Sequence, residues 1–113
     1  METAANTVQL SNGLSMPLIG LGTFQLMSKE AIVTAIGDIG YRHLDTAWLY
    51  QNEEIIGEAL QEVIGSERVK REELFVTTKI WPSQFGDVEG AVRGSLKSLG
   101  LEYVDLYLIH WPT

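Results

Sequence analysis

Four polar residues that could carry acid–base chemistry lie at or just past the ends of strand-like segments in this 113-residue chain: Asp45, Tyr50, Lys79 and His110. Three of them end apolar or β-branched runs, and Tyr50 follows Asp45 by a short loop. If the strands are parallel, all four side chains gather at the carboxyl edge of one sheet, which is where α/β folds place their chemistry.

These residue types fit the reduction of a carbonyl group. A phenol with a pKa of about 10 holds its proton at neutral pH, and giving the proton up costs roughly 4 kcal/mol. A nearby ammonium lowers that cost by favouring the phenolate, and a carboxylate paired with the ammonium fixes its position. An imidazole can donate to, or orient, a substrate oxygen. None of the four is a good nucleophile, so hydrolysis through a covalent intermediate fits poorly.

Each of the four residues also has a structural explanation when it is considered alone. Asp45 could cap a helix, and Tyr50 could be a packing aromatic with a wet hydroxyl. Lys79 could be a solvated residue at a strand end, and His110 a hydrogen-bonded core histidine. Their shared position at the ends of neighbouring strand–helix units favours one common site.

Four aromatic residues come just after strands on the same edge: Phe24, Trp48, Trp81 and Trp111. Core packing is the alternative explanation, and it accounts for one or two of them. We expect these four, together with His110, to line an apolar substrate pocket.

A repeating strand–helix pattern must position these residues. The predicted strands are 18–22, 43–47, 74–80 and 104–110, and helical segments with apolar stripes lie at 31–39, 55–64 and 88–99. This alternation predicts an α/β fold with parallel strands and right-handed crossovers. The last strand is nearly all apolar, as expected for a strand that is covered on both faces.

Turn and cap residues set the boundaries of these elements. Asn12-Gly13 predicts a hairpin over residues 7–17. Asn52 is a predicted N-cap of the second helix, and the helices should stop at Gly40, Gly65 and Gly100. Two further glycines, Gly90 and Gly94, weaken the third helix by about 1 kcal/mol each relative to alanine, unless they allow close packing on the sheet.

Composition narrows the function classes. With 8 basic and 15 acidic residues the net charge is −7, which disfavours binding to nucleic acid or an anionic membrane. There is no cysteine, and the two histidines lack zinc-site spacing, so no metal site is expected. No signal-peptide pattern or membrane-length apolar run is present, so we expect a cytoplasmic, soluble protein.

The glycines at the end of the first strand do not form a Rossmann fingerprint. Gly20-Leu21-Gly22 would need a third glycine at position 25, where Gln25 stands, and the next helix does not begin at the second glycine. A Rossmann phosphate cradle is therefore rejected. The two glycines still allow close approach to the backbone at this point.

Five separated motifs closely resemble the aldo-keto reductases, and the aldose and aldehyde reductase branch is the most similar. The motifs are MPLIGLGTF (16–24), GYRHLDTA (40–47), YQNE (50–53), REELFV (71–76) and YVDLYLIHWP (103–112). The similarity runs from about residue 8 to residue 113, and the motifs have family-like spacing, so the resemblance is highly specific.

The resemblance implies a (β/α)8 TIM barrel that reduces aldehydes and ketones to alcohols with NADPH and without a Rossmann domain. It implies that Tyr50 is the proton donor, Lys79 its pKa-lowering partner and Asp45 the ion-pair mate of the lysine. His110 is the substrate-orienting imidazole. The implied cofactor-binding residues are Gly22, Thr23, Phe24 and Asp45. Many family members have tryptophan at position 24, so the phenylalanine is a mild departure.

Length is the larger departure from the family. A complete barrel has about 250 residues, so we expect residues 1–113 to be a single segment, the amino-terminal half of a barrel. It would comprise a hairpin (7–17) and βα units (18–113) with about the first four strands. The phosphate- and adenine-binding residues would lie outside it. The full-length protein is expected to be a monomer that acts on a small-molecule carbonyl substrate.

Two alternatives to the reductase remain open at this point. A non-catalytic member of the same fold could keep all four polar residues, so the sequence alone does not separate it from an enzyme. A half-barrel could also work by associating with another chain through its exposed strand edges.

Overall fold

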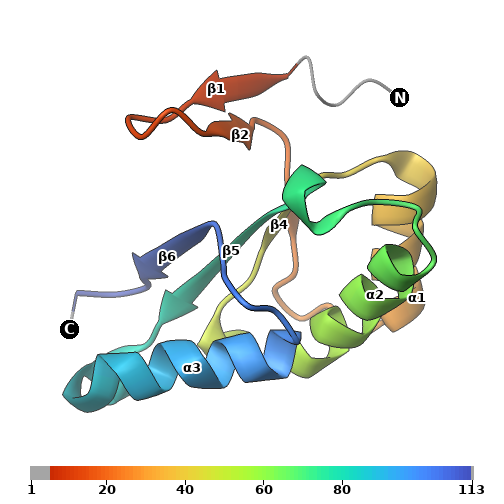
Figure 1. Ribbon diagram of the computed structural model, residues 1–113. Helices are drawn as coiled ribbons and strands as arrows, with labels where there is room; N and C mark the ends of the chain where they lie inside the picture. Colours follow the sequence, from red (N-terminus) through yellow and green to blue (C-terminus); the bar gives the residue numbers. More distant parts are fainter. Residues whose placement is uncertain (1–5, 113) are drawn as a thin grey trace.

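The computed structural model describes residues 6–112, which form a small hairpin and a larger α/β unit (Figure 1). The hairpin joins β1 (Thr7–Gln9) and β2 (Ser15–Pro17) in antiparallel register, with Thr7 opposite Pro17. Its turn uses Gly13 at a φ of 89°, and the Asn12 side chain accepts a hydrogen bond from the Leu14 amide at 3.0 Å. The hairpin predicted over residues 7–17 is confirmed.

The α/β unit is built on four parallel strands in sequential order. They are β3 (Leu21–Gly22), β4 (His43–Asp45), β5 (Phe75–Ile80) and β6 (Leu106–Ile109). The connecting helices are α1 (Lys29–Thr34), extended by a π-helical turn (Ala35–Ile39), α2 (Glu53–Gly65) and α3 (Val88–Leu99). Shorter 3₁₀ turns cover Trp48–Tyr50, Arg71–Glu73 and Pro82–Asp87. The predicted parallel α/β alternation is confirmed.

One face of the sheet packs against the helices and forms the core. Leu44 of β4 and Val76 of β5 are paired across the sheet and fully buried. They meet the apolar stripes of the helices, whose fully buried members include Ile32, Ile36, Ile56, Leu60 and Val63. Because side chains alternate along a strand, the residues on either side of Leu44 point to the opposite face of the sheet. The core thus fixes which residues line the other face.

The first strand is shorter than predicted. Residues 18–20 are not paired in the four-stranded sheet, and Leu18 and Ile19 are 63% and 64% exposed. The Leu18 amide donates instead to the Asn6 carbonyl beside the hairpin, and the Pro17 carbonyl contacts the His43 ring. These bonds hold residues 18–20 as a link between the hairpin and the sheet.

The last strand is not covered on both faces. β6 has β5 as its neighbour and lies at the edge of the described sheet, and Leu108 and Ile109 are 38% and 66% exposed. The prediction of full burial was wrong because no element of residues 6–112 packs over the end of this strand. No helix within the same range is long and apolar enough to cross a membrane.

Glycine positions partly follow the predictions. Gly40 and Gly100 have left-handed φ angles of 104° and 70° at helix ends, whereas Gly65 is the last residue of α2 and the left-handed residue after it is Glu67. The suggested close packing at Gly90 and Gly94 is wrong, because both lie on the exposed side of α3. The close approach involves Gly57, where α2 crosses the end of α3.

Gly57→Ala is expected to lower the free energy of unfolding by about 1–3 kcal/mol, the usual cost of overpacking. A β-carbon at this position would lie 2.5 Å from the Ser98 carbonyl oxygen, which is backbone and cannot rotate away. Gly94→Ala is the matched control, because a β-carbon there meets nothing within 4 Å. It is expected to stabilise α3 by up to about 1 kcal/mol. Urea unfolding of both variants checks the difference, and equal effects would contradict it.

Candidate active site

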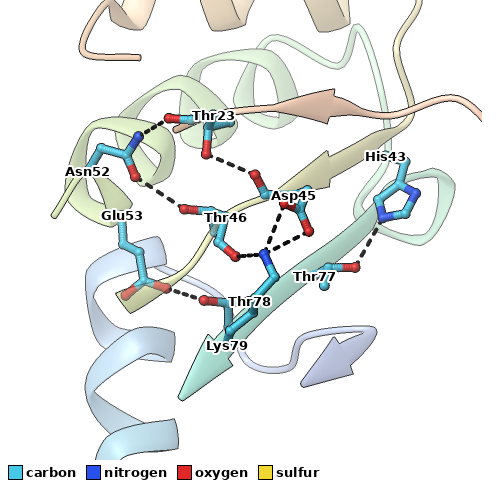
Figure 2. Close-up of polar contacts among 9 residues, drawn as sticks. All are labelled: Thr23, His43, Asp45, Thr46, Asn52, Glu53, Thr77, Thr78 and Lys79. Atoms are coloured by element: carbon cyan, nitrogen blue, oxygen red, sulfur yellow. Dashed lines mark hydrogen bonds and ion pairs between the residues drawn. The ribbon is translucent and has the colours of Figure 1, made fainter. Parts of the chain in front are cut away.

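The carboxyl edge of the sheet brings Asp45 and Lys79 into direct contact. Asp45 ends β4 and pairs with Thr77, two residues before Lys79 on the same face of β5. The Lys79 Nζ donates to both carboxylate oxygens of Asp45 and to the Thr46 carbonyl, each at 2.9 Å (Figure 2). The lysine side chain is only 13% exposed. Three acceptors therefore hold the ammonium in one place.

Tyr50 lies directly beside this ion pair. It ends the 3₁₀ turn after β4, and Gln51 follows it with a left-handed φ of 59°. The Lys79 Nζ lies 5.3 Å from the centroid of the Tyr50 ring, and the His110 ring meets the tyrosine edge-on at 5.7 Å. The structure thus brings all four predicted polar residues together at one edge of the sheet.

Two of the four predicted aromatic residues also contact this group, and a third, Trp111, contacts one of those two. Phe24 packs on Tyr50 with ring centroids 5.2 Å apart, and Trp81 meets His110 edge-on at 5.4 Å. Trp111 follows at 6.4 Å from Trp81. Phe24 and Trp111 are 65% and 56% exposed, so both rings present apolar surface beside the polar residues.

Trp48 lies apart from this aromatic group. It makes no ring contact with the other aromatic residues in the described part of the chain. It borders a separate hollow of about 330 Å³ that also includes Gln51, Glu54 and Ser98. Its place in a substrate pocket remains a prediction.

The residues predicted to bind a cofactor differ from one another in their exposure. A β-carbon placed on Gly22 would meet nothing within 4 Å, so the space above this glycine is open. Thr23 is fully buried, and its amide and its hydroxyl both donate to the Asp45 carbonyl, at 3.1 and 2.9 Å. Gly22 and Phe24 therefore face open space, whereas the Thr23 side chain ties β3 to β4.

The two histidines have different partners. His43 lies further back on β4, where its Nδ1 contacts the Pro17 carbonyl at 3.1 Å and its Nε2 contacts the Thr77 hydroxyl at 3.0 Å. The Nδ1 of His110 is buried and has no hydrogen-bond partner among residues 6–112. No group of three or more acidic or histidine side chains in that range could hold a metal ion.

Two buried polar residues near the site were missed by the sequence analysis. Asn52 is the N-cap residue of α2, as predicted, but its side chain makes no capping hydrogen bond. The amide is instead directed at the neighbouring loops. Glu53, the first residue of α2, is only 6% exposed. Polar residues at a helix start usually indicate caps or favourable dipole interactions, so the sequence pattern does not reveal the buried hydrogen bonds of these two side chains.

Glu53 links α2 to β5 and α3. Its carboxylate accepts hydrogen bonds from the Thr78 hydroxyl at 2.6 Å and the Ser95 hydroxyl at 2.9 Å, which belong to β5 and α3. Burial raises the pKa of this carboxyl above its usual value of 4.5, and the two hydroxyl donors offset the rise only in part. Thr78 precedes Lys79, so the carboxyl supports the strand that presents the lysine.

Glu53→Gln is expected to change how stability depends on pH. Because the carboxyl pKa is higher in the folded chain, the folded state binds more protons than the unfolded state above pH 4.5. The stabilising contribution is complete below that pH and is lost as the pH rises through the raised pKa. In thermal unfolding from about pH 4 to about pH 8, the wild-type Tm should therefore fall relative to that of Glu53→Gln.

The exposed neighbour Glu54 provides the control for this experiment. Glu54→Gln removes a carboxyl from the same turn of α2 but from its exposed side, so its Tm should follow that of the wild type with pH. A constant Tm difference between wild type and Glu53→Gln over the whole range would contradict the effect of burial.

Comparison with known proteins places these features in a family. A sequence model described as the Aldo/keto reductase family matches residues 13–113. The chain is 52% identical over 110 residues to the NADP-dependent D-sorbitol-6-phosphate dehydrogenase of Malus domestica, covering 95% of this chain and 35% of the relative. It is 53% identical over 115 residues to Aldo-keto reductase family 1 member A1 of Sus scrofa, covering 96% and 35%.

A solved structure gives the same result for the fold. The aldo-keto reductase of Bombyx mori in complex with NADP superposes with a TM-score of 0.88 at 44% sequence identity, covering 94% of this chain and 38% of that protein. The predicted fold class, the (β/α)8 barrel family, is confirmed. The chain spans about 35% of the length of the curated relatives that it matches.

Proposed function

Because the chain belongs to the aldo/keto reductase family, we propose that the protein catalyses the NADPH-dependent reduction of aldehydes and ketones to alcohols. The observation that carries this proposal is the placement of Tyr50 beside an ammonium group held by three acceptors. A proton donor next to a fixed positive charge suits the protonation of a developing alkoxide.

Tyr50 is the proposed proton donor. Its phenol gives its proton to the carbonyl oxygen of the substrate as the carbonyl carbon is reduced. Lys79 stabilises the negative charge that develops on the phenol oxygen, and Asp45 holds the ammonium group in position. This arrangement is set before the substrate arrives, so little reorganisation is needed during the reaction.

His110 and the aromatic residues are proposed to hold the substrate. The His110 ring lies against both Tyr50 and Trp81, so an oxygen near the phenol is also within reach of the imidazole edge. Phe24, Trp81 and Trp111 offer apolar surface around that point, which suits aldehydes with aromatic or long apolar substituents.

The open space above Gly22 and the exposed ring of Phe24 fit the flat nicotinamide end of NADPH. When it is bound, NADPH supplies the hydride that reduces the carbonyl carbon. The Malus domestica relative is named as NADP-dependent, and the Bombyx mori structure contains NADP, which supports the choice of this cofactor. We assign residues 22–24 and Asp45 to the nicotinamide side of the site.

We also propose that this chain contributes the first four strands of a barrel. The exposed ends of β6 and the share of the relatives that is covered both favour this arrangement. On this proposal the hairpin closes one end of the barrel, while the polar group at the carboxyl edge lines the other.

Turnover by the product of the complete gene tests the proposed function. The protein should oxidise NADPH, followed by the loss of absorbance of the reduced nicotinamide, only when a simple aromatic aldehyde is present. One equivalent of alcohol should form for each NADPH consumed. If a panel of aldehydes and ketones gave no turnover although the protein bound NADPH, a non-catalytic role within the same fold would be favoured.

A further inference from the structure

We propose that Asn52 is a positioning residue that couples the loop carrying Tyr50 to the two strand ends beside it. The inference rests on the proposed function, because it gives a role in the same site to a residue outside the four polar groups. Its evidence is the complete set of contacts made by one buried amide.

The side chain of Asn52 is buried and fully hydrogen-bonded. The residue is only 1% exposed. Its Oδ1 accepts from the Thr46 hydroxyl at 3.1 Å, and its Nδ2 donates to the Thr23 carbonyl at 2.6 Å (Figure 2). The same Nδ2 also donates to the Leu26 carbonyl at 2.9 Å. Both amide protons and the amide oxygen are therefore used. Thr23 and Leu26 belong to the loop after β3, whereas Thr46 is the first residue after β4, at the start of the connection that ends at Asn52.

These partners lead directly to the reactive groups. The Thr46 carbonyl is the third acceptor of Lys79, so the loop that Asn52 holds on one side also holds the ammonium. On the other side, Thr23 precedes Phe24, whose ring packs on Tyr50. Asn52 follows Tyr50 by two residues, so one side chain ties the end of the loop that carries the proton donor to the start of that loop at Thr46 and to the loop after β3.

The alternative role of Asn52, as an ordinary helix cap, does not explain these contacts. Its side chain makes no capping hydrogen bond to α2, and only its main-chain carbonyl joins the helix, by accepting from the Ile56 amide at 3.0 Å. Among residues 6–112, the side-chain amide therefore bonds only to the loops after β3 and β4. Its loss should displace the groups around Tyr50 and Lys79 rather than the first turn of α2.

Two substitutions remove this coupling from opposite ends. In the product of the complete gene, Asn52→Ala and Thr46→Val are each expected to lower kcat by about 10- to 100-fold, because small displacements of reacting groups have effects of this size. The KM for the aldehyde should change less than kcat does. Thr46→Ser, which keeps the hydroxyl, should recover most of the loss caused by Thr46→Val.

A double-mutant comparison separates coupling from two independent losses. If both residues act through the same hydrogen bond, Asn52→Ala combined with Thr46→Val should be little worse than Asn52→Ala alone. Effects that multiply would overturn the inference. Glu54→Ala, which changes an exposed residue on the same turn of α2, should leave kcat within about twofold of the wild type.

Amide hydrogen exchange provides a readout that does not depend on activity. Asn52→Ala should speed exchange in both residues 23–28 and residues 46–51, whereas Glu54→Ala should not. A change confined to residues 53–57 would indicate a local helix role and would overturn the inference. So would an Asn52→Ala variant whose kcat stays within about twofold of an active wild type.

The same measurements distinguish failure of the inference from failure of the proposed function. If the wild-type protein shows no turnover, the reductase proposal fails. The exchange data still decide whether Asn52 links the two loops. If the wild type is active and exchange changes only at the start of α2, the reductase proposal stands and the inference about Asn52 falls.

Discussion

Tyr50→Phe should lower kcat for aldehyde reduction by about 10²- to 10⁴-fold, the usual contribution of a positioned general acid. The variant loses one oxygen atom and keeps the ring that packs on Phe24 and on His110. The fold and the ring contacts should therefore survive, and the loss should fall on proton transfer. Steady-state kinetics with an aromatic aldehyde, together with thermal unfolding of both proteins, measure the two effects separately.

Tyr103→Phe is the matched control for this substitution. It removes the same atom from a tyrosine whose ring lies 4.0 Å from the Arg71 guanidinium, just before β6 and away from the polar group at the carboxyl edge. Its kcat should equal that of the wild type. If Tyr50→Phe kept activity within about twofold of the wild type, another group would have to protonate the substrate.

The grouping of the four polar residues could be predicted because parallel strands align their carboxyl ends. Asp45 pairs with Thr77, and Lys79 is two residues further along β5. Because side chains alternate along a strand, Asp45 and Lys79 lie on the same face of the sheet. Leu44 and Val76, which form the pair just before Asp45 and Thr77, face the helices. The two-residue alternation of side chains and the parallel direction of the strands are therefore enough to predict that Asp45 and Lys79 lie close together.

The buried hydrogen bonds that hold the loops and strands around these four residues could not be predicted from the same patterns. Asn52 and Glu53 stand where a helix begins, and side chains of these types are equally suited to caps and to buried hydrogen bonds. Only the three-dimensional approach of the loops after β3 and β4 shows where the Asn52 amide is directed. Thr46 is six residues before Asn52, but Thr23 and Leu26 are 29 and 26 residues before it, and no helix or strand spacing predicts these contacts.

Local sequence does not determine which residues are buried where contacts with distant elements decide it. Leu18 and Ile19 are residue types common in strands, but the Leu18 amide donates to the Asn6 carbonyl beside the hairpin, and both side chains are exposed. Gly57 looked like any helix-interior glycine, and its importance depends on the carbonyl of Ser98 on another helix. In each case the deciding contact is non-local.

Asp105→Ala is expected to lower the free energy of unfolding by about 3 kcal/mol, near the lower limit for breaking a buried ion pair because each side chain keeps 14% exposure. The Oδ2 of Asp105 accepts from the Arg71 guanidinium at 2.9 Å and from the Val76 amide at 2.8 Å. Its loss leaves a cation and a buried amide of β5 without this partner. Urea unfolding of the product of the complete gene measures the change.

Two further variants show which part of this contribution comes from charge. Glu89→Ala breaks an exposed pair with Arg93, whose side chains are 74% and 75% exposed, and should change stability by less than about 0.5 kcal/mol. Asp105→Asn keeps an oxygen for the Val76 amide but loses the charge opposite Arg71, so its effect should lie between the other two. If Asp105→Ala were no more destabilising than Glu89→Ala, the ion pair would not hold the starts of β5 and β6 together. The sheet register that presents Lys79 and His110 would then depend on the apolar core alone.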